Sequence, residues 1–267
     1  MNPHGKSPAF PSVTRTMAVL FLALGATLCL AAPAAFGQTP AAPATPPPPL
    51  EFGVDYKSTL GPRTLLKDTG KPLELVYVFW YGCGSCRELD PSVDQYAKLL
   101  PPDVVFAKIH AMYAPNLLWT NQARLFHTLQ YLGKEEELHK EIFKEVQENG
   151  GTDGEGRALA GLADLDSMLL FAEKHGISKE DFTKAWESPE VEKRFQLALT
   201  FIDNLDIDSV PAMAVNGKWA FTVMRGKGRG HFFRTADELL ARERELLSGS
   251  GAETSNATGA ATGNAPK

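Results

Sequence analysis

The chain has 267 residues, of which 43% are hydrophobic and 22% are charged, and its formal net charge is -5 at pH 7. This is the composition of an ordinary globular protein. It lacks the excess of basic residues that nucleic-acid-binding proteins carry, so no nucleic acid is expected as a partner.

The N-terminal segment has the pattern of a secretory leader. Lys6 and Arg15 provide positive charge ahead of an apolar stretch at 17–30 that is too short to span a bilayer comfortably. A small-x-small cleavage site, Ala35-Phe36-Gly37, follows it. We therefore expect residues 1–37 to be a signal peptide that is removed by cleavage before Gln38.

Cysteine placement gives the expected compartment. Cys29 lies inside the apolar stretch of the leader, and Leu28 before it is not the small residue that a lipoprotein signal requires. Cleavage would leave Cys83 and Cys86 in an exported, oxidising compartment. A short, alanine-rich leader of this kind favours the bacterial periplasm.

Two low-complexity segments bound the expected folded part. Residues 38–50 are proline-rich and should form an extended linker. Residues 249–267 consist mainly of Gly, Ala, Ser and Thr, and a disordered tail is expected there. The roughly 200 residues between them suit one domain, or one domain with an insertion.

The folded part begins with a strand–helix–strand pattern. Residues 73–81 form a nearly continuous apolar run, which predicts a strand covered on both faces. A helix is expected over 83–100, with Pro91 inside it, and a second buried strand over 104–109. Together these elements predict a βαβ unit.

A block of helices is predicted next. Apolar residues recur at helical spacing, and Gly133 and Gly176 mark helix ends. Ser178 with Asp181 forms a weak capping box at the start of one helix. The expected helices cover 117–132, 135–147, 164–175, a stretch from 178, and 189–205.

Strand patterns then return near the C-terminus. Asn216-Gly217 is a strong hairpin signal between expected strands at 212–215 and 218–223. Thr235 with Glu238 forms a capping box, which predicts a closing helix that ends at about 247. The last unit is therefore expected to be ββα.

The pair Cys83-Gly84-Ser85-Cys86 lies at the predicted strand-to-helix junction. A disulfide that closes so small a loop stabilises little, whereas a helix N-terminus favours the thiolate, which is the attacking species in disulfide exchange. A zinc half-site is the alternative, but it needs two more ligands. The sequence has no second cysteine pair and its histidines are scattered, so no metal is expected.

Two motifs resemble those of one known family. Residues 79–86 look like its FWYGCxxC motif, and residues 210–218 look like its VPAxxVNGK segment. On these motifs the chain resembles the periplasmic DsbA family of disulfide oxidoreductases. The resemblance implies an α/β, thioredoxin-like fold with a helical domain inserted between the βαβ and ββα units. The implied parts are a first thioredoxin-like segment at 51–114, the inserted helical domain at 115–205 and a second thioredoxin-like segment at 206–248.

The resemblance also implies an activity and partners. The protein would introduce disulfide bonds into exported proteins through a redox-active Cys83–Cys86 disulfide, with Cys83 forming the mixed disulfide and Gly84-Ser85 as the active-site dipeptide. Pro211 would follow a cis peptide bond and, with Val210, face the substrate. Reduced exported proteins would be the substrates, a membrane quinone-linked reoxidase of DsbB type would restore the disulfide, and a monomer without cofactors is expected.

The sequence departs from the family at two positions. Gly84-Ser85 occupies the place of a typical Pro-His dipeptide, and Tyr77 occupies the place of a buried acid six residues before the first cysteine. Ser85 can offer only a neutral hydrogen bond to the thiolate. We therefore expect a higher Cys83 pKa and a less oxidising potential than in a Pro-His relative, and slower exchange because a proton acceptor near Cys86 is missing.

Two other functions are consistent with this pattern. A reductase or isomerase of the same fold would run the exchange in the opposite direction, although the short linker before residue 51 leaves no room for the dimerisation domain of the isomerases. A chaperone-like module that binds peptides is the alternative from outside the enzymes.

Overall fold

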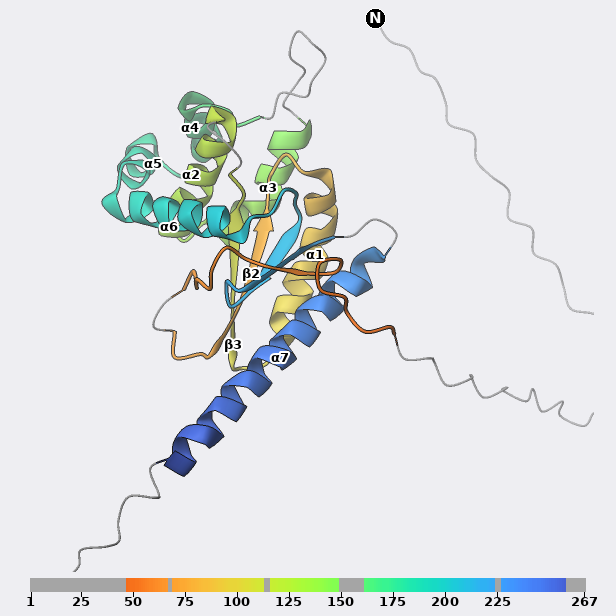
Figure 1. Ribbon diagram of the computed structural model, residues 1–267. Coiled ribbons are helices and arrows are strands. Elements are labelled where there is room, and N and C mark those ends of the chain that lie inside the picture. The colour runs from red at the N-terminus through yellow and green to blue at the C-terminus, as the bar shows by residue number, and fades with distance from the viewer. Residues whose placement is uncertain (1–46, 67–68, 113–115, 149–160, 224–226, 258–267) are drawn as a thin grey trace, which may run out of the picture. The chain divides into compact units, whose positions relative to one another are not determined.

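Two parallel strands and an antiparallel hairpin form the centre of the protein (Figure 1). The computed structural model describes residues 47–66, 69–112, 116–148, 161–223 and 227–257, with side chains to 249. The expected signal peptide, most of the expected linker and residues 258–267 lie outside the described residues. The fold given below is that of the unit Pro48–Lys267.

The sheet has five strands in the order β1-β5-β4-β2-β3. β2 pairs with β3 in parallel and with β4 antiparallel, and the other neighbours are antiparallel. All seven residues of β2 are buried, which explains the continuous apolar run that predicted this strand. The strands are β1 (Lys57–Ser58), β2 (Leu73–Phe79), β3 (Val104–His110), β4 (Ala212–Val215) and β5 (Trp219–Thr222). The two-residue β1 was not predicted.

The helices follow the predicted order. One helix joins β2 to β3, five lie between β3 and β4 in the described chain, and one follows β5, so the predicted sequence of βαβ, helices and ββα is confirmed. The helices are α1 (Gly84–Leu99), α2 (Leu117–Tyr131), α3 (Glu135–Glu148), α4 (Leu165–Lys174), α5 (Lys179–Trp186), α6 (Pro189–Leu205) and α7 (Gly228–Ala257). Ser178 caps α5 as predicted, since its side chain accepts a hydrogen bond from the Asp181 N–H.

The last helix differs from the prediction at both ends. α7 begins at Gly228, and Thr235 lies inside it, where its hydroxyl donates to the His231 carbonyl instead of capping the helix. α7 also continues to Ala257, so the expectation of a disordered tail from residue 249 is wrong for 249–257. A helix that is already nucleated extends at one hydrogen bond per residue, which carries it past the packed part.

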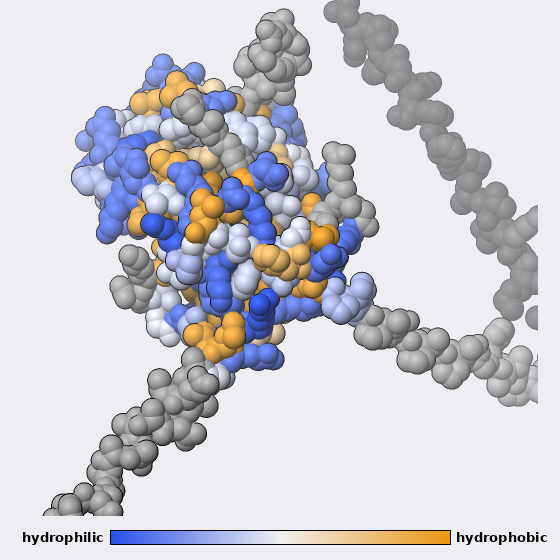
Figure 2. All heavy atoms as spheres, viewed as in Figure 1, coloured by the Kyte–Doolittle hydropathy of each residue, from blue (hydrophilic) through white to orange (hydrophobic). Residues whose placement is uncertain are grey.

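The two faces of the sheet are covered by different helices. Side chains of Tyr77 and Phe79 on β2 belong to a core shared with α1, α3 and α7, whereas Val76 and Val78 pack on the other face with residues of α6. Hydrophilic residues and several separate apolar groups are interspersed on the face shown in Figure 2. No helix in the described parts of the chain is long and apolar enough to cross a membrane.

Candidate active site

The turn from β2 into α1 carries the cysteine pair. Cys83 is the N-cap of α1, and its sulfur accepts a hydrogen bond of 3.1 Å from the Cys86 N–H. The Ser85 hydroxyl lies 3.2 Å from the same sulfur. Cys83 is half-buried and Cys86 is buried, and both are free thiols. The redox-active Cys83–Cys86 disulfide stays a prediction.

The two thiols have opposite acidities. A hydrogen bond from the Cys86 side chain, with smaller contributions from Ser85 and from backbone N–H groups, lowers the pKa of Cys83 from 9.0 to about 6, against the opposing effect of burial. Burial raises the pKa of Cys86 well above its usual value, and the neighbouring Cys83 adds to this. At neutral pH, Cys83 is therefore mainly a thiolate and Cys86 a thiol.

The segment before β4 lies against the pair. The Val210–Pro211 peptide bond is cis, as the resemblance implies. The Val210 carbonyl oxygen lies 3.6 Å from the Cys83 sulfur, within reach of a hydrogen bond from the thiol. Pro211 is buried and Val210 is partly exposed. The structure thus brings Val210 and Pro211, which are far away in sequence, to Cys83.

The helical block also contacts the active-site turn. The Gln147 side chain, on α3, donates hydrogen bonds to the Tyr81 carbonyl at 2.7 Å and the Cys83 carbonyl at 3.2 Å. The Trp80 indole donates to Gln122 of α2 at 3.0 Å. Sequence reasoning missed both glutamines, because a single polar residue in an amphipathic helix gives no signal of its own.

A chain of buried polar groups runs beneath the turn. The Tyr81 hydroxyl lies 3.0 Å from His139 Nδ1, and His139 Nε2 lies 3.1 Å from Asp90 Oδ1. The Lys108 ammonium contacts Asp90 Oδ1 at 2.8 Å and Asp94 at 2.6 Å. The chain connects α3 with α1 and β3, and sequence reasoning assigned none of these residues to the site.

These contacts shift the pKa values of Asp90 and His139 in the direction that favours the charged form of each. Burial raises the pKa of Asp90, but the hydrogen bond and charge of His139, followed by those of Lys108, outweigh it and lower the pKa overall. Burial likewise lowers the pKa of His139, but hydrogen bonds to Asp90 and Glu135 reverse the effect, so its pKa is raised. A buried carboxylate is thus maintained one helical turn after Cys86.

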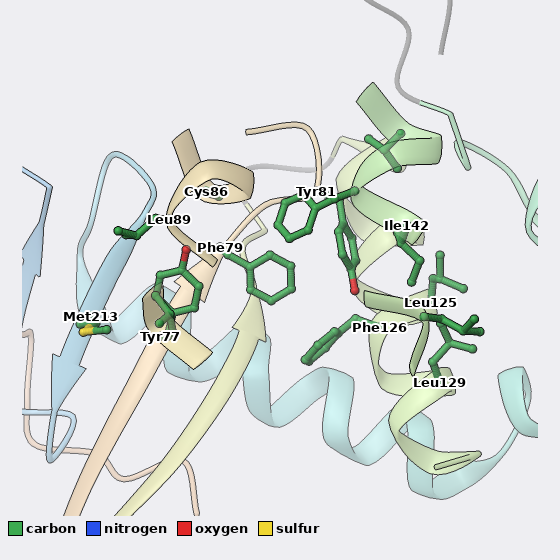
Figure 3. Close-up of a cluster of buried hydrophobic side chains, with 14 of the residues drawn as sticks. Tyr77, Phe79, Tyr81, Cys86, Leu89, Leu125, Phe126, Leu129, Ile142 and Met213 are labelled. Carbon is green, nitrogen blue, oxygen red and sulfur yellow. The ribbon is translucent and has the colours of Figure 1, made fainter. Parts of the chain in front are cut away.

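Tyr77 lies where the resemblance implies a buried acid. Its side chain is fully buried on β2, and Figure 3 shows its hydroxyl directed toward the helix that carries Cys86 and Leu89. Burial is the largest effect that raises the pKa of Tyr77, and interactions with Cys86, Asp90 and Cys83 raise it further. Tyr77 is therefore neutral at every physiological pH.

Side chains that could ligate a metal ion do not cluster among the described residues. No three side chains of Cys, His, Asp or Glu come together among them. Structural zinc sites take four such ligands. The chemistry that the pair can perform in this setting is thiol–disulfide exchange, with Cys83 as the reactive sulfur.

No family model matches the chain. It is 34% identical over 172 residues to the thiol:disulfide interchange protein DsbA of Azotobacter vinelandii, a match covering 64% of this chain and 75% of that protein. It is 30% identical over 196 residues to DsbA of Pseudomonas syringae pv. tomato, covering 73% and 86% of the two chains. The crystal structure of Pseudomonas aeruginosa DsbA is similar with a TM-score of 0.63 at 27% identity, covering 74% of this chain and 97% of that one.

Proposed function

Because this chain belongs to the DsbA family of thiol:disulfide interchange proteins, we propose that it donates the Cys83–Cys86 disulfide to reduced proteins. The chain is a thiol:disulfide oxidoreductase with a thioredoxin-like α/β fold. The proposal concerns the residues that react, the substrates that they act on and the compartment in which the protein works.

The proposed reaction has two exchange steps. A substrate thiolate attacks the Cys83 sulfur of the oxidised protein, the Cys83–Cys86 bond breaks, and Cys86 leaves as a thiolate that takes up a proton. A second substrate thiolate then attacks the substrate sulfur of the mixed disulfide, and Cys83 leaves as a thiolate. Two electrons pass from the substrate to the pair, and no cofactor is required.

The observation that carries this direction of transfer is the environment of the Cys83 sulfur. It accepts the Cys86 N–H bond at 3.1 Å, lies 3.2 Å from the Ser85 hydroxyl, and has a pKa of about 6. A thiolate that is stabilised in this way is a good leaving group, and it stabilises the reduced form. Both effects favour transfer of the disulfide from this protein to a substrate.

The substrate peptide is proposed to lie beside Val210 and Pro211. The Val210 carbonyl is already next to the Cys83 sulfur, and Val210 is partly exposed. An extended peptide could pair with the backbone at this position, as in other cases where a strand adds to an exposed edge. Gly84 and Ser85 would form the exposed turn between the two sulfurs.

The location and partners are proposed from the sequence and the family. We propose that residues 1–37 export the protein to the periplasm and are then removed, and that residues 38–50 link the leader to the folded part. Reduced exported proteins would be the substrates, and a membrane quinone-linked reoxidase of DsbB type would regenerate the disulfide. We further propose a monomer, built from segments 51–114 and 206–248 with the helical domain 115–205 inserted between them.

The other candidate functions are less well supported. The relatives named above are interchange proteins and do not favour a reductase, an isomerase or a binding module without catalysis. No observation in the described residues favours one of these alternatives over disulfide donation.

Oxidation of a reduced, unfolded protein with two cysteines tests the proposal. The oxidised protein should transfer its disulfide stoichiometrically, and Cys83→Ala should lose all transfer. Cys86→Ala that carries glutathione in a mixed disulfide at Cys83 should still exchange glutathione for a substrate thiol, with glutathione leaving as the thiol. Transfer by Cys83→Ala would refute the assigned roles. If Cys83→Ala still protects the substrate from aggregation and the wild-type protein transfers no disulfide, the binding module is the correct function.

A further inference from the structure

His139 lies in the core between the helical block and the active-site turn. It is 4% exposed, it belongs to α3, and the rings of Phe79 and Phe143 pack against it edge to face. Each of its ring nitrogens faces an acid. Nε2 lies 3.1 Å from Asp90 Oδ1, and Nδ1 lies 3.1 Å from Glu135 Oε1. Two carboxylates that are held against one ring away from water are costly unless the ring carries a compensating charge.

These two contacts favour the protonated form of His139. A neutral imidazole has one N–H, so it could donate to one of the two carboxylates and would present a lone pair to the other. An imidazolium donates from both nitrogens and pairs with both acids. Burial lowers the pKa of His139, but the hydrogen bonds to Asp90 and Glu135 outweigh it and raise the pKa overall, which agrees with this geometry.

The other groups around the His139 ring were considered element by element. The Tyr81 hydroxyl, in the active-site turn, lies 3.0 Å from Nδ1. On β3, the like charge of the Lys108 ammonium opposes protonation of the ring. His110, also on β3, is buried, and its pKa is lowered to about 3, so it stays neutral. From α2 the ring is contacted by Phe126, which carries no charge. Asp90 and Glu135 are therefore the acids that decide the charge of the ring.

Helix α3 contacts the active-site turn at two points. His139 reaches Asp90 on α1 and the Tyr81 hydroxyl. About two helical turns further along α3, Gln147 donates hydrogen bonds to the carbonyls of Tyr81 and Cys83. The contact between Gln147 and the turn therefore depends on how firmly His139 fixes α3 to α1.

We propose that His139 is a positioning residue, an imidazolium paired with Asp90 and Glu135 that holds α3 on the active-site turn and releases it when the ring loses its proton to solvent. We call these three residues the His139 clasp. While the ring is charged, Gln147 stays on the Cys83 carbonyl. Loss of the proton leaves two carboxylates with a single donor between them, so α3 separates from the turn more often. Disulfide transfer should then slow, a consequence that rests on the proposed function.

The His139 clasp should work below a certain pH and fail above it. Folding raises the pKa of His139 above its ordinary 6.5, so its contribution to stability is fully present below pH 6.5. This contribution is lost as pH rises through the folded value. The dependence is opposite in sign to that of Cys83, whose lowered pKa contributes stability at high pH.

Nuclear magnetic resonance tests the charge on the ring directly. In the reduced protein, the nitrogen and carbon shifts of His139 should titrate with a midpoint above pH 6.5. Glu135→Gln should lower this midpoint by about 1–3 pH units, because it removes one acid and keeps the size of the side chain. Glu136→Gln changes an exposed acid in the same first turn of α3 and should leave the midpoint unchanged. The spectrum of His139→Asn identifies the resonance.

Hydrogen exchange tests whether the His139 clasp holds the turn. The protection factor of the Cys83 amide should fall about tenfold as pH rises through the His139 midpoint, which is the equivalent of one hydrogen bond. The amide of Leu239 in α7 should keep its protection factor. In Glu135→Gln the fall should move to lower pH together with the midpoint. Disulfide transfer to a reduced peptide, corrected for the thiolate fraction of the peptide, should decline over the same pH range as the Cys83 protection factor.

Three results would overturn the His139 clasp. They are a His139 midpoint at or below pH 6.5, a midpoint that Glu135→Gln leaves unchanged, and a Cys83 protection factor that does not follow the midpoint. The first and the third are measured on the wild-type protein and decide the question even if a variant does not fold. If His139 titrates as expected but the protein transfers no disulfide at any pH, the proposed function fails while the His139 clasp stands.

Discussion

The backbone N–H of Cys86 donates a hydrogen bond of 3.1 Å to the sulfur of Cys83, so the second cysteine stabilises the thiolate of the first. The bond exists because Cys83 is the N-cap of α1, where the first N–H groups of the helix have no partner within the helix. The same geometry places the Cys86 side chain inside the core. The start of α1 therefore creates one acidic, accessible thiol at Cys83 and one buried, weakly acidic thiol at Cys86.

Alkylation should distinguish the two thiols. In the reduced protein at pH 6, iodoacetamide should label Cys83 rapidly, because about half of it is thiolate at its pKa of about 6. Cys86 should remain unlabelled until the protein is unfolded in urea. Mass spectrometry of tryptic peptides gives the sites, and Cys83→Ser tests Cys86 alone. Labelling of Cys86 in the folded variant at the rate of a free thiol would reverse the assignment.

The free energy of unfolding of the reduced protein should depend on pH through the titration of Cys83. That of the oxidised protein should lack this dependence. The Cys83 pKa falls on folding from 9.0 to about 6, so its stabilisation is fully present above pH 9 and is lost as pH falls through 6. Because Cys83 is partly exposed, we expect only about 2 kcal/mol from it. The oxidised pair has no thiol to titrate.

Urea unfolding of both forms at pH 5 and pH 8.5 measures this effect. The free energy of unfolding of the reduced protein, minus that of the oxidised protein, should rise with pH over this interval. Other titrating groups largely cancel in the difference. A difference that stays constant between the two pH values would show that the Cys83 thiolate is not stabilised by folding.

Ser85→Ala should raise the Cys83 pKa. The substitution removes the hydroxyl that lies 3.2 Å from the sulfur, while the backbone N–H bond of Cys86 remains. Because this backbone bond remains, the pKa of Cys83 should stay below 9.0. Thiolate absorbance near 240 nm, followed against pH, gives the midpoint, and Ser85→Thr is the control that keeps a hydroxyl. An unchanged midpoint in Ser85→Ala would mean that the hydroxyl bonds solvent rather than sulfur.

Gln147→Ala should loosen the active-site turn. The amide bonds the carbonyls of Tyr81 and Cys83, and removing it should cost about 1–2 kcal/mol of stability and speed hydrogen exchange in the turn. Gln196→Ala removes an exposed bond within α6 and serves as the control, with a loss below about 0.5 kcal/mol. Equal unfolding free energies for the two variants would count against a role of α3 in holding the turn.

Much of the fold was predictable because its signals are local. The continuous apolar run of β2, the Asn216-Gly217 turn and the helical periodicity of α2 and α6 are properties of short stretches. The two residues of β1 are too few to produce a pattern, and they form a strand only because β5 offers them an edge. The extension of α7 past 249 runs against its composition, since Gly249 and Gly251 disfavour helix.

The site was predictable only where a motif marks it. Cys83 and Cys86 are conspicuous in the sequence, but Asp90 and His139 are single polar residues on amphipathic helices and resemble solvated positions there. Their partners lie on other parts of the chain, namely Lys108 on β3 and Tyr81 in the turn between β2 and α1. Contacts between distant segments depend on tertiary packing, which sequence periodicity does not encode.

The reduction potential of the Cys83–Cys86 pair tests disulfide donation most directly. It is measured by equilibrating the protein with glutathione buffers and reading the oxidised fraction by tryptophan fluorescence or thiol trapping. A Cys83 thiolate with a pKa of about 6 stabilises the reduced form, so the potential should lie between about -120 and about -200 mV. A value near about -270 mV, which is typical of thioredoxin, would mean that the pair is a reductant and would contradict the proposed function.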